Sequence, residues 1–243
     1  MKKIILSSIV ASIMATSASA FMGLNAEIGG GIWMPSLSGT ATTTNSIDFG
    51  TANMDDKSAS GNNYLYADFS HFVPVVPNIR IEKLSYNIDS KTISNSEKVD
   101  MKQTDIVAYW GIPVISTATA GVLNLNVGVD VKNFKGTINT GPIFSDKSFD
   151  ETLPLLYLNT RISVPFAPVN LEATAKLISY DGTKISDNEA KMSIKLPIPA
   201  PFVNFNLDIG YKTQNVTISD NLVSGLNTNL DTKGAFFGLN AKF

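Results

Sequence analysis

The sequence predicts an all-β fold, a transmembrane antiparallel up-and-down β-barrel of about ten strands. Apolar and polar residues alternate through ten segments, as they do in strands with one apolar face. The connections between these segments switch between short proline-rich turns and longer polar loops. The chain also ends in an alternating strand, residues 236–243, and this terminal edge is protected if the strand pairs with the first one and closes the sheet.

Residues 1–20 have the pattern of a cleaved export signal. Two lysines precede an apolar run over residues 4–14, which is too short to cross a bilayer as a helix. Ala18 and Ala20 then supply the small residues of a leader-peptidase site. An uncleaved anchor helix is the alternative. The expected mature chain is a single barrel over residues 21–243.

The composition excludes several other classes of protein. The chain has no cysteine, so it is not a disulfide-stapled scaffold. Hydrophobic residues make up 44% of the sequence, yet after the leader no window is continuously apolar over the length of a transmembrane helix. Loss of Lys2 and Lys3 with the leader lowers the count of Lys and Arg from 19 to 17, against 21 Asp and Glu. This mild acidity argues against a nucleic-acid partner.

The first four predicted strands cover residues 24–34, 64–73, 79–88 and 105–112. In the first of them every second residue from Leu24 to Met34 is apolar or glycine. The third alternates regularly from Ile79 and changes phase near Lys83, which predicts a β-bulge there and places Tyr86 on the apolar face. The third and fourth strands have the weakest patterns, so eight or twelve strands are alternatives to ten.

The other six predicted strands cover residues 123–132, 156–164, 171–180, 189–196, 203–212 and 236–243. The fifth strand is the clearest, because Leu123, Val127 and Val131 share one face and the other carries only asparagine, glycine and charged residues. Each segment is close to the length of about 9–11 residues that a tilted strand needs to cross a membrane. An even number of strands is typical of bacterial barrels.

Four of the connections are short and rich in proline, around residues 74–77, 113–114, 165–168 and 197–201. Proline cannot donate to a β-ladder, so these positions end strands. The other five are longer and rich in Ser, Thr, Asn, Asp and Gly, at roughly residues 36–62, 90–103, 135–151, 181–188 and 215–232. Outer-membrane barrels have short turns on the periplasmic side and long loops on the outside.

A soluble β-sandwich or lipocalin-like barrel is the alternative architecture. Such proteins also alternate apolar and polar residues, but they turn the apolar face inward. The membrane barrel is favoured because the apolar face carries almost no charge, whereas the other face collects charges of both signs. In that arrangement the charged face lines the lumen.

Two segments carry a resemblance to known proteins. Residues 236–243 resemble the closing strand of bacterial outer-membrane β-barrels, whose terminal phenylalanine belongs to the signal read by the barrel-assembly machinery; here Phe237, Leu239 and Phe243 would carry it. Residues 26–35 resemble the amino-terminal motif of a family of small Gram-negative outer-membrane β-barrel proteins with a glycine-rich first strand. The glycines themselves are interpreted structurally, since glycine lets backbones approach closely.

These resemblances imply a location and a fold, and no activity, because the family has no established one. They imply export to the bacterial outer membrane, with lipid and lipopolysaccharide as surroundings and with periplasmic chaperones and the barrel-assembly machinery as partners during biogenesis. A monomer without a cofactor is expected.

Fifteen charged residues are predicted to line the lumen: Glu27, Asp68, Arg80, Glu82, Asp105, Asp130, Lys132, Arg161, Glu172, Lys176, Lys191, Lys195, Asp208, Lys212 and Lys242. Acidic residues dominate among those of the first four strands, and basic residues among those of the later ones. Opposite charges in a narrow lumen either pair into a network that fills it or line a thin aqueous channel. Ten strands make a narrow barrel, which favours the filled lumen and leaves the channel as the alternative.

Catalysis is not expected. The chain has one histidine, His71, next to a proline turn, and it has no recognisable nucleophile, phosphate-binding or metal-ligand motif. A barrel lipid hydrolase is therefore the remote alternative. A surface-loop adhesin or interaction protein is another, because the polar connection over residues 36–62 is long and such loops carry binding functions on rigid scaffolds.

Overall fold

The computed structural model describes residues 24–42, 46–52, 62–91, 96–139, 147–222 and 227–243. It consists of strands and one short helix: β1 (Leu24–Thr42), β2 (Ser46–Ala52), β3 (Asn63–His71), β4 (Asn78–Lys91), β5 (Ser96–Gly111), α2 (Pro113–Ala118), β6 (Leu123–Asn139), β7 (Lys147–Ser163), β8 (Val169–Tyr180), β9 (Thr183–Lys195), β10 (Asn204–Ile218) and β11 (Asn227–Lys242). The proposed export signal and its cleavage residues, Ala18 and Ala20, lie outside the described residues.

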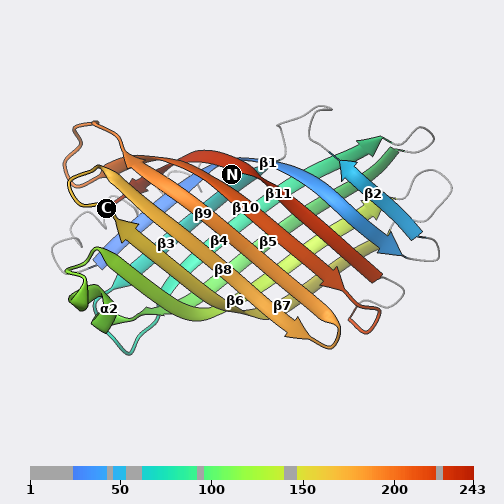
Figure 1. Cartoon of the computed structure of the whole chain (residues 1–243), viewed down its shortest axis with the longest axis horizontal. Coiled ribbons are helices and arrows are strands. Elements are labelled where there is room, and N and C mark those ends of the chain that lie inside the picture. Colours follow the sequence, from blue (N-terminus) through green and yellow to red (C-terminus); the bar gives the residue numbers. More distant parts are fainter. Residues whose placement is uncertain (1–23, 43–45, 53–61, 92–95, 140–146, 223–226) are drawn as a thin grey trace, which may run out of the picture.

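Ten of the described strands form a closed antiparallel up-and-down barrel (Figure 1). Each of them pairs with its neighbour in the chain, apart from β1, which pairs directly with β3, and β11 closes the ring by pairing with β1. The short strand β2 pairs only with the far end of β1 and adds no member to the ring. The predicted fold class and the predicted ten strands are therefore confirmed.

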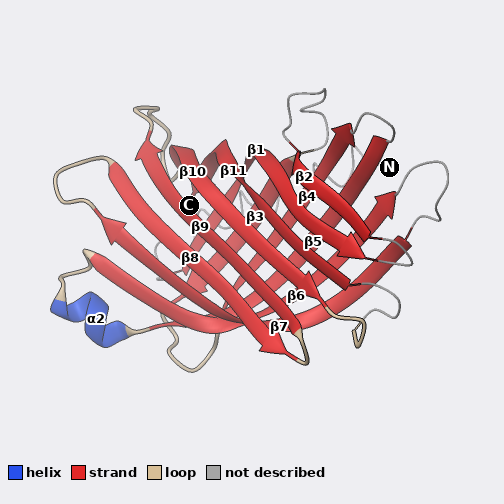
Figure 2. Cartoon of the chain, turned by 45° about the vertical axis from the view of Figure 1, so that its right-hand side comes forward, coloured by secondary structure: helices blue, strands red, loops and turns tan. Residues whose placement is uncertain are grey.

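The two ends of the barrel differ (Figure 2). The connections over residues 72–77, 112–122, 164–168 and 196–203 lie at one end, here called the short-turn end, and the second of them contains α2. The turn at residues 181–182, between β8 and β9, lies at the opposite end, here called the long-loop end. No helix in the described part of the chain is long and apolar enough to cross a membrane.

Much of what the sequence suggested as polar loops is β-strand. Strands β5, β6, β7, β10 and β11 run far into the predicted loops 90–103, 135–151 and 215–232. The predicted loop 181–188 is reduced to a two-residue turn between β8 and β9. The prediction failed because it assigned a strand only where the outward face was apolar. These segments are polar on their outward face.

The outward face changes character along one line of the barrel. Ile81, Ile106 and Val131 stand side by side in register and are 43–50% exposed. The next outward-facing row toward the long-loop end is polar, with Lys83 opposite Thr104 and then Asn133. The same step occurs across the barrel, where a row of Met34, Ala235, Tyr211 and Ala190 is followed by a row of Ser36, Lys233, Thr213 and Asn188.

The inward face changes in the opposite sense. On β4 the inward side chains run from Arg80 and Glu82 to Leu84 and Tyr86. Toward the long-loop end the barrel therefore becomes polar outside and apolar inside, as in a soluble barrel, whereas toward the short-turn end it is apolar outside and charged inside. We call the first part the outer segment and the band of outward-facing apolar residues on the second part the apolar belt.

The predicted bulge at Lys83 is absent. Strand β4 pairs with β3 and β5 without a break in register, and Lys83 stays on the outward face. The change of phase in the sequence reflects the change in chemistry between the two parts of the barrel. Leu84 and Tyr86, which the bulge would have turned outward, point inward because the outer segment has an apolar interior.

Glycines on the inward face make room for aromatic rings of the adjacent strand. Gly29 stands opposite Tyr66, and a Cβ atom at Gly29 would lie 2.6 Å from the Tyr66 ring. Gly210 stands opposite Phe236 in the same way. The glycine run in β1 therefore has the packing role that the sequence suggested, since any side chain would displace a ring from the lumen.

Gly31 is a sensitive position at the closing pair of strands, where it stands opposite Gly238. A Cβ atom on Gly31 would collide with the backbone carbonyl oxygen of Phe237 and lie 2.5 Å from the Cα atom of Gly238. We expect Gly31→Ala to lower the free energy of unfolding by about 1–3 kcal/mol, because two paired backbones must separate. Urea titration of both proteins in detergent micelles measures this difference in the free energy of unfolding.

Gly111→Ala is the matched control for this substitution. The added Cβ atom would meet only the Asn126 side chain, at 3.4 Å, so its effect should stay within about 0.5 kcal/mol. Equal destabilisation by the two substitutions would contradict the close backbone packing assigned to Gly31 between β1 and β11.

Candidate functional site

The lumen is the site that the sequence singled out, and the structure places all fifteen predicted charged residues on its inward face. Strand alternation brings this about, since each strand contributes every second side chain. Fourteen of them lie within the barrel. Lys195 is the exception, because its side chain is exposed at the mouth of the short-turn end.

One group of charges surrounds Lys176 of β8. Its ammonium group lies 2.5 Å from Glu82 of β4 and 2.5 Å from Asp105 of β5. Lys132 lies 2.8 Å from the same Asp105 carboxylate and 2.9 Å from Asp187 of β9. The lysine side chains are only 2% exposed, so these pairs lie in a solvent-poor interior, where each ion depends on its partners.

A second group lies nearer the short-turn end. Arg161 of β7 pairs with Glu172 at 2.9 Å and reaches Glu27 of β1 at 3.6 Å. In the ring order of the strands, β7 and β1 are opposite one another, so this contact crosses the lumen. Tyr66 adds a second cross-link, since its hydroxyl lies 2.7 Å from Glu27 and 3.2 Å from Asp208 of β10.

A pair of glutamines crosses the lumen on the long-loop side of the charged groups. The Nε2 atom of Gln103 donates to Oε1 of Gln214 at 2.6 Å, and the Nε2 atom of Gln214 donates back to Oε1 of Gln103 at 2.8 Å. Gln103 is on β5 and Gln214 on β10, again opposite strands of the ring. Tyr86 donates to the same Gln214 oxygen at 3.2 Å. Direct hydrogen bonds thus span the full width of the barrel.

The interior of the outer segment is apolar. Trp33, Tyr86, Met101 and Phe134 are each at most 2% exposed, and they belong to one cluster that also includes side chains of β7, β9, β10 and β11. The ring of Trp33 meets the edge of Tyr86 at a centroid distance of 5.1 Å. This cluster fills the barrel between the glutamine pair and the long-loop end.

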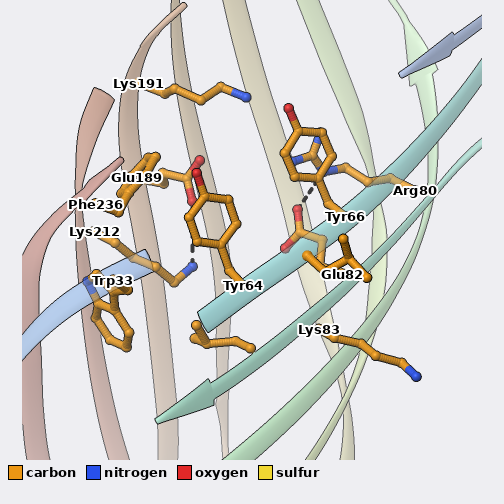
Figure 3. A pocket seen from close by; sticks show the side chains of 12 residues that line it. Trp33, Tyr64, Tyr66, Arg80, Glu82, Lys83, Glu189, Lys191, Lys212 and Phe236 are labelled. Atoms are coloured by element: carbon orange, nitrogen blue, oxygen red, sulfur yellow. Dashed lines mark hydrogen bonds and ion pairs between the residues drawn. The ribbon is translucent and has the colours of Figure 1, made fainter. Parts of the chain in front are cut away.

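The space left inside the barrel is small. A cavity of about 40 Å³ lies between the charged and apolar layers, with Tyr66, Glu189, Lys191 and Lys212 among its lining residues. Figure 3 shows the side chains around it. Larger hollows, of about 350 and 260 Å³, lie at the short-turn end, where asparagines and Lys242 line them. The described part of the lumen therefore has polar hollows at the short-turn end, and beyond them charged, glutamine and apolar side chains contact one another across the barrel.

No protein-family profile matches the chain, and a search of curated proteins finds no match. Solved structures of similar architecture include the translocator domain of the autotransporter NalP from Neisseria meningitidis, with 12% identity, a TM-score of 0.42 and coverage of 100% of this chain and 98% of that one. A Pseudomonas aeruginosa FadL homologue has 8% identity, a TM-score of 0.39 and coverage of 91% and 90%. Neisserial surface protein A has 12% identity, a TM-score of 0.36 and coverage of 91% and 97%.

At these identities the similarity concerns the barrel architecture alone. The glycine-rich family suggested by residues 26–35 stays an interpretation of the sequence.

Sequence reasoning missed three residues that close the lumen. Asp187 holds both Lys132 and Lys212, the latter at 2.5 Å, yet it fell within a predicted loop. Gln103 and Gln214 lay at or near the borders of predicted loops. The signal was present, because Asp187 has the same parity as the inward-facing Lys191, and extending the alternation past the polar outward residues would have found it.

His71 has a structural role at the short-turn end. Its Nε2 atom lies 3.2 Å from the carbonyl oxygen of Pro77, and its Nδ1 atom accepts a hydrogen bond from the Val73 amide at 3.3 Å. The neutral tautomer with hydrogen on Nε2 satisfies both contacts.

The predicted assembly residues Phe237 and Leu239 face outward from β11, and Phe243 donates its backbone N–H to the carbonyl oxygen of Ala26 at 2.8 Å.

Proposed function

We propose that the protein is an integral barrel of the bacterial outer membrane with a sealed, non-conducting lumen. The reciprocal hydrogen bonds of Gln103 and Gln214 carry the proposal, because they join opposite strands between the charged and the apolar layers. A narrow passive channel would need a continuous water-filled path. In the described lumen such a path is interrupted by the hydrogen bonds and ion pairs that join opposite walls.

The apolar belt supports membrane insertion. Large aliphatic side chains cover the outside of the barrel in register, and residues such as Leu65, Leu156 and Leu239 are 48–58% exposed. In β6 the belt runs from Leu123 to Val131, nine residues, which is close to what a tilted membrane strand requires. In water such a surface would aggregate, whereas acyl chains solvate it.

Exposed aromatic residues at the short-turn end support the same location. Phe166 and Phe202 are 109% and 71% exposed and have φ values of 63° and 68°, in the left-handed region that rarely holds a bulky residue. Each follows a proline. An interfacial position at the membrane surface explains why such turns hold phenylalanine where glycine would be less strained.

In this proposal the short-turn end faces the periplasm and the outer segment faces the outside. Lipid and lipopolysaccharide surround the apolar belt, the protein is a monomer, and the barrel-assembly machinery reads the terminal strand with Phe237, Leu239 and Phe243. The role is structural, without catalysis or cofactor, and His71 has its ring nitrogens occupied in a turn. The surface-loop alternative has only the composition of residues 36–62 in its favour, and residues 53–61 lie outside the described part of the chain.

Planar-bilayer recording tests the sealed lumen. We expect the refolded protein to give no discrete conductance steps, because contacts across the lumen exclude a continuous ion path. Flotation of the same preparation with vesicles verifies that it has inserted. Reproducible steps whose size changes in Lys191→Glu, a residue inside the lumen, would overturn the sealed lumen and favour the narrow channel.

A further inference from the structure

Four polar residues form a square on the outside of the barrel, directly beyond the apolar belt. On β4 and β5, Lys83 stands opposite Thr104, and Ser85 stands opposite Lys102. All four face outward, so two lysines occupy one diagonal of the square and two hydroxyl groups the other. Figure 3 includes Lys83 among the residues around the internal cavity, and its side chain is directed away from Glu189, Lys191 and Lys212.

The two lysines of the square have no acidic partner among the described residues. Neither makes an ion pair of 4.0 Å or less with a residue that the structure describes, whereas the neighbouring Lys135 is held by Asp150 at 2.6 Å. Lys102 also stands directly opposite Lys135 in the ladder between β5 and β6. Like charges in opposed positions destabilise a sheet, and a bound anion would remove that cost. Asp100 lies two residues from Lys102 on the same face.

We infer that Lys83, Ser85, Lys102 and Thr104 bind the phosphate group of a phosphorylated lipid in the outer leaflet. The square is about 5–8 Å across and presents two ammonium groups and two hydroxyl groups. All four can donate hydrogen bonds to the oxygen atoms of one phosphate group. The inference rests on the proposed membrane location, and it adds to it a specific lipid contact.

The position of the square favours a lipid over a free anion. The outward row next to it toward the short-turn end contains Ile81 and Ile106, which are 43% and 50% exposed. A phosphate held by the square would therefore place its acyl chains along the apolar belt. A free phosphate ion would contact only the polar square and would gain nothing from the apolar belt.

Native mass spectrometry of the refolded protein in neutral detergent tests the inference. The probes are bisphosphorylated lipid A and the same lipid after enzymatic dephosphorylation. We expect the phosphorylated form to bind at least about 10-fold more tightly, and we expect K83A/K102A to bind it about 10- to 30-fold more weakly than the natural protein. K83R/K102R keeps both charges and should retain most of the binding.

The matched control is K184A/K233A, which removes the same charge from outward-facing lysines of β9 and β11. The ladder partners of Lys184 and Lys233 are uncharged serines and threonines, so binding should fall by less than about 3-fold. An equal loss in the two double variants would overturn the site in favour of general surface charge. Displacement of the lipid by equimolar inorganic phosphate would overturn the lipid as its ligand.

Flotation with phosphatidylcholine vesicles separates this inference from the proposed function. All variants should float, because insertion depends on the apolar belt and not on the square. Failure of every protein to float would refute the membrane barrel itself, whereas floating proteins that do not discriminate between the two lipids would refute only the phosphate site.

Discussion

Replacing Trp33 with alanine is expected to lower the free energy of unfolding by about 3–5 kcal/mol. The indole is 1% exposed, packs against the Tyr86 ring and donates its Nε1–H to the carbonyl oxygen of Gly234 at 3.1 Å. Removing it leaves a cavity in a close-packed apolar interior and an unpaired carbonyl group. Urea unfolding in detergent, followed by the gel shift of the folded barrel, measures the loss.

Trp110 is a natural control, because the chain has two tryptophans and this one faces outward. It is 38% exposed, and its Nε1–H also donates to a backbone carbonyl, that of Val75, at 3.2 Å. Trp110→Ala removes an equal side chain from the detergent-covered surface and should cost less than about 1 kcal/mol. If the two substitutions cost the same, the outer segment lacks the packed interior described here.

Replacing Lys176 with methionine is expected to cost about 3–5 kcal/mol. Methionine keeps the volume of the side chain but removes one of the two cations that each of Glu82 and Asp105 contacts, in an interior that water scarcely reaches. Asp130, whose carboxylate lies 3.8 Å from Lys176 and accepts no hydrogen bond from a described side chain, loses its nearest positive charge as well. The same unfolding assay measures this variant.

Lys135→Met provides the comparison for the charge. Lys135 makes an ion pair of similar length with Asp150, but both side chains are more than half exposed, so its loss should cost less than about 1 kcal/mol. A cost for Lys176→Met as small as this would mean that water solvates the lumen, and the sealed barrel would have to be abandoned.

The barrel combines two kinds of β-protein in one set of strands. In the proposed membrane location, acyl chains replace water around the apolar belt, so the hydrophobic effect acts on the outside there and paired charges fill the inside. In the same proposal water surrounds the outer segment, which is why its apolar residues face inward and stabilise the interior as in a soluble barrel. The strands pass from one environment to the other without a break in register.

Alternation determined the strands of the apolar belt, because a period of two residues fixes the face of each side chain. The near absence of charge from the apolar face then predicted the direction of the lumen and the fifteen inward-facing charges. The alternation of the terminal strand predicted that the sheet closes, because an unpaired edge is otherwise left at the end of the chain. These features depend only on residues close together in the chain, so they could be predicted from it.

Which charges meet across the lumen was decided only by the tertiary structure. Arg161 and Glu27 are far apart in the sequence, and barrel closure places their strands on opposite walls. The outer segment escaped prediction for a related reason, since beyond the apolar belt the polar Lys83 faces outward and the apolar Tyr86 faces inward, the reverse of the pattern within the belt. The sequence specifies the alternation, but the surrounding solvent, which the fold positions along each strand, determines which face is apolar.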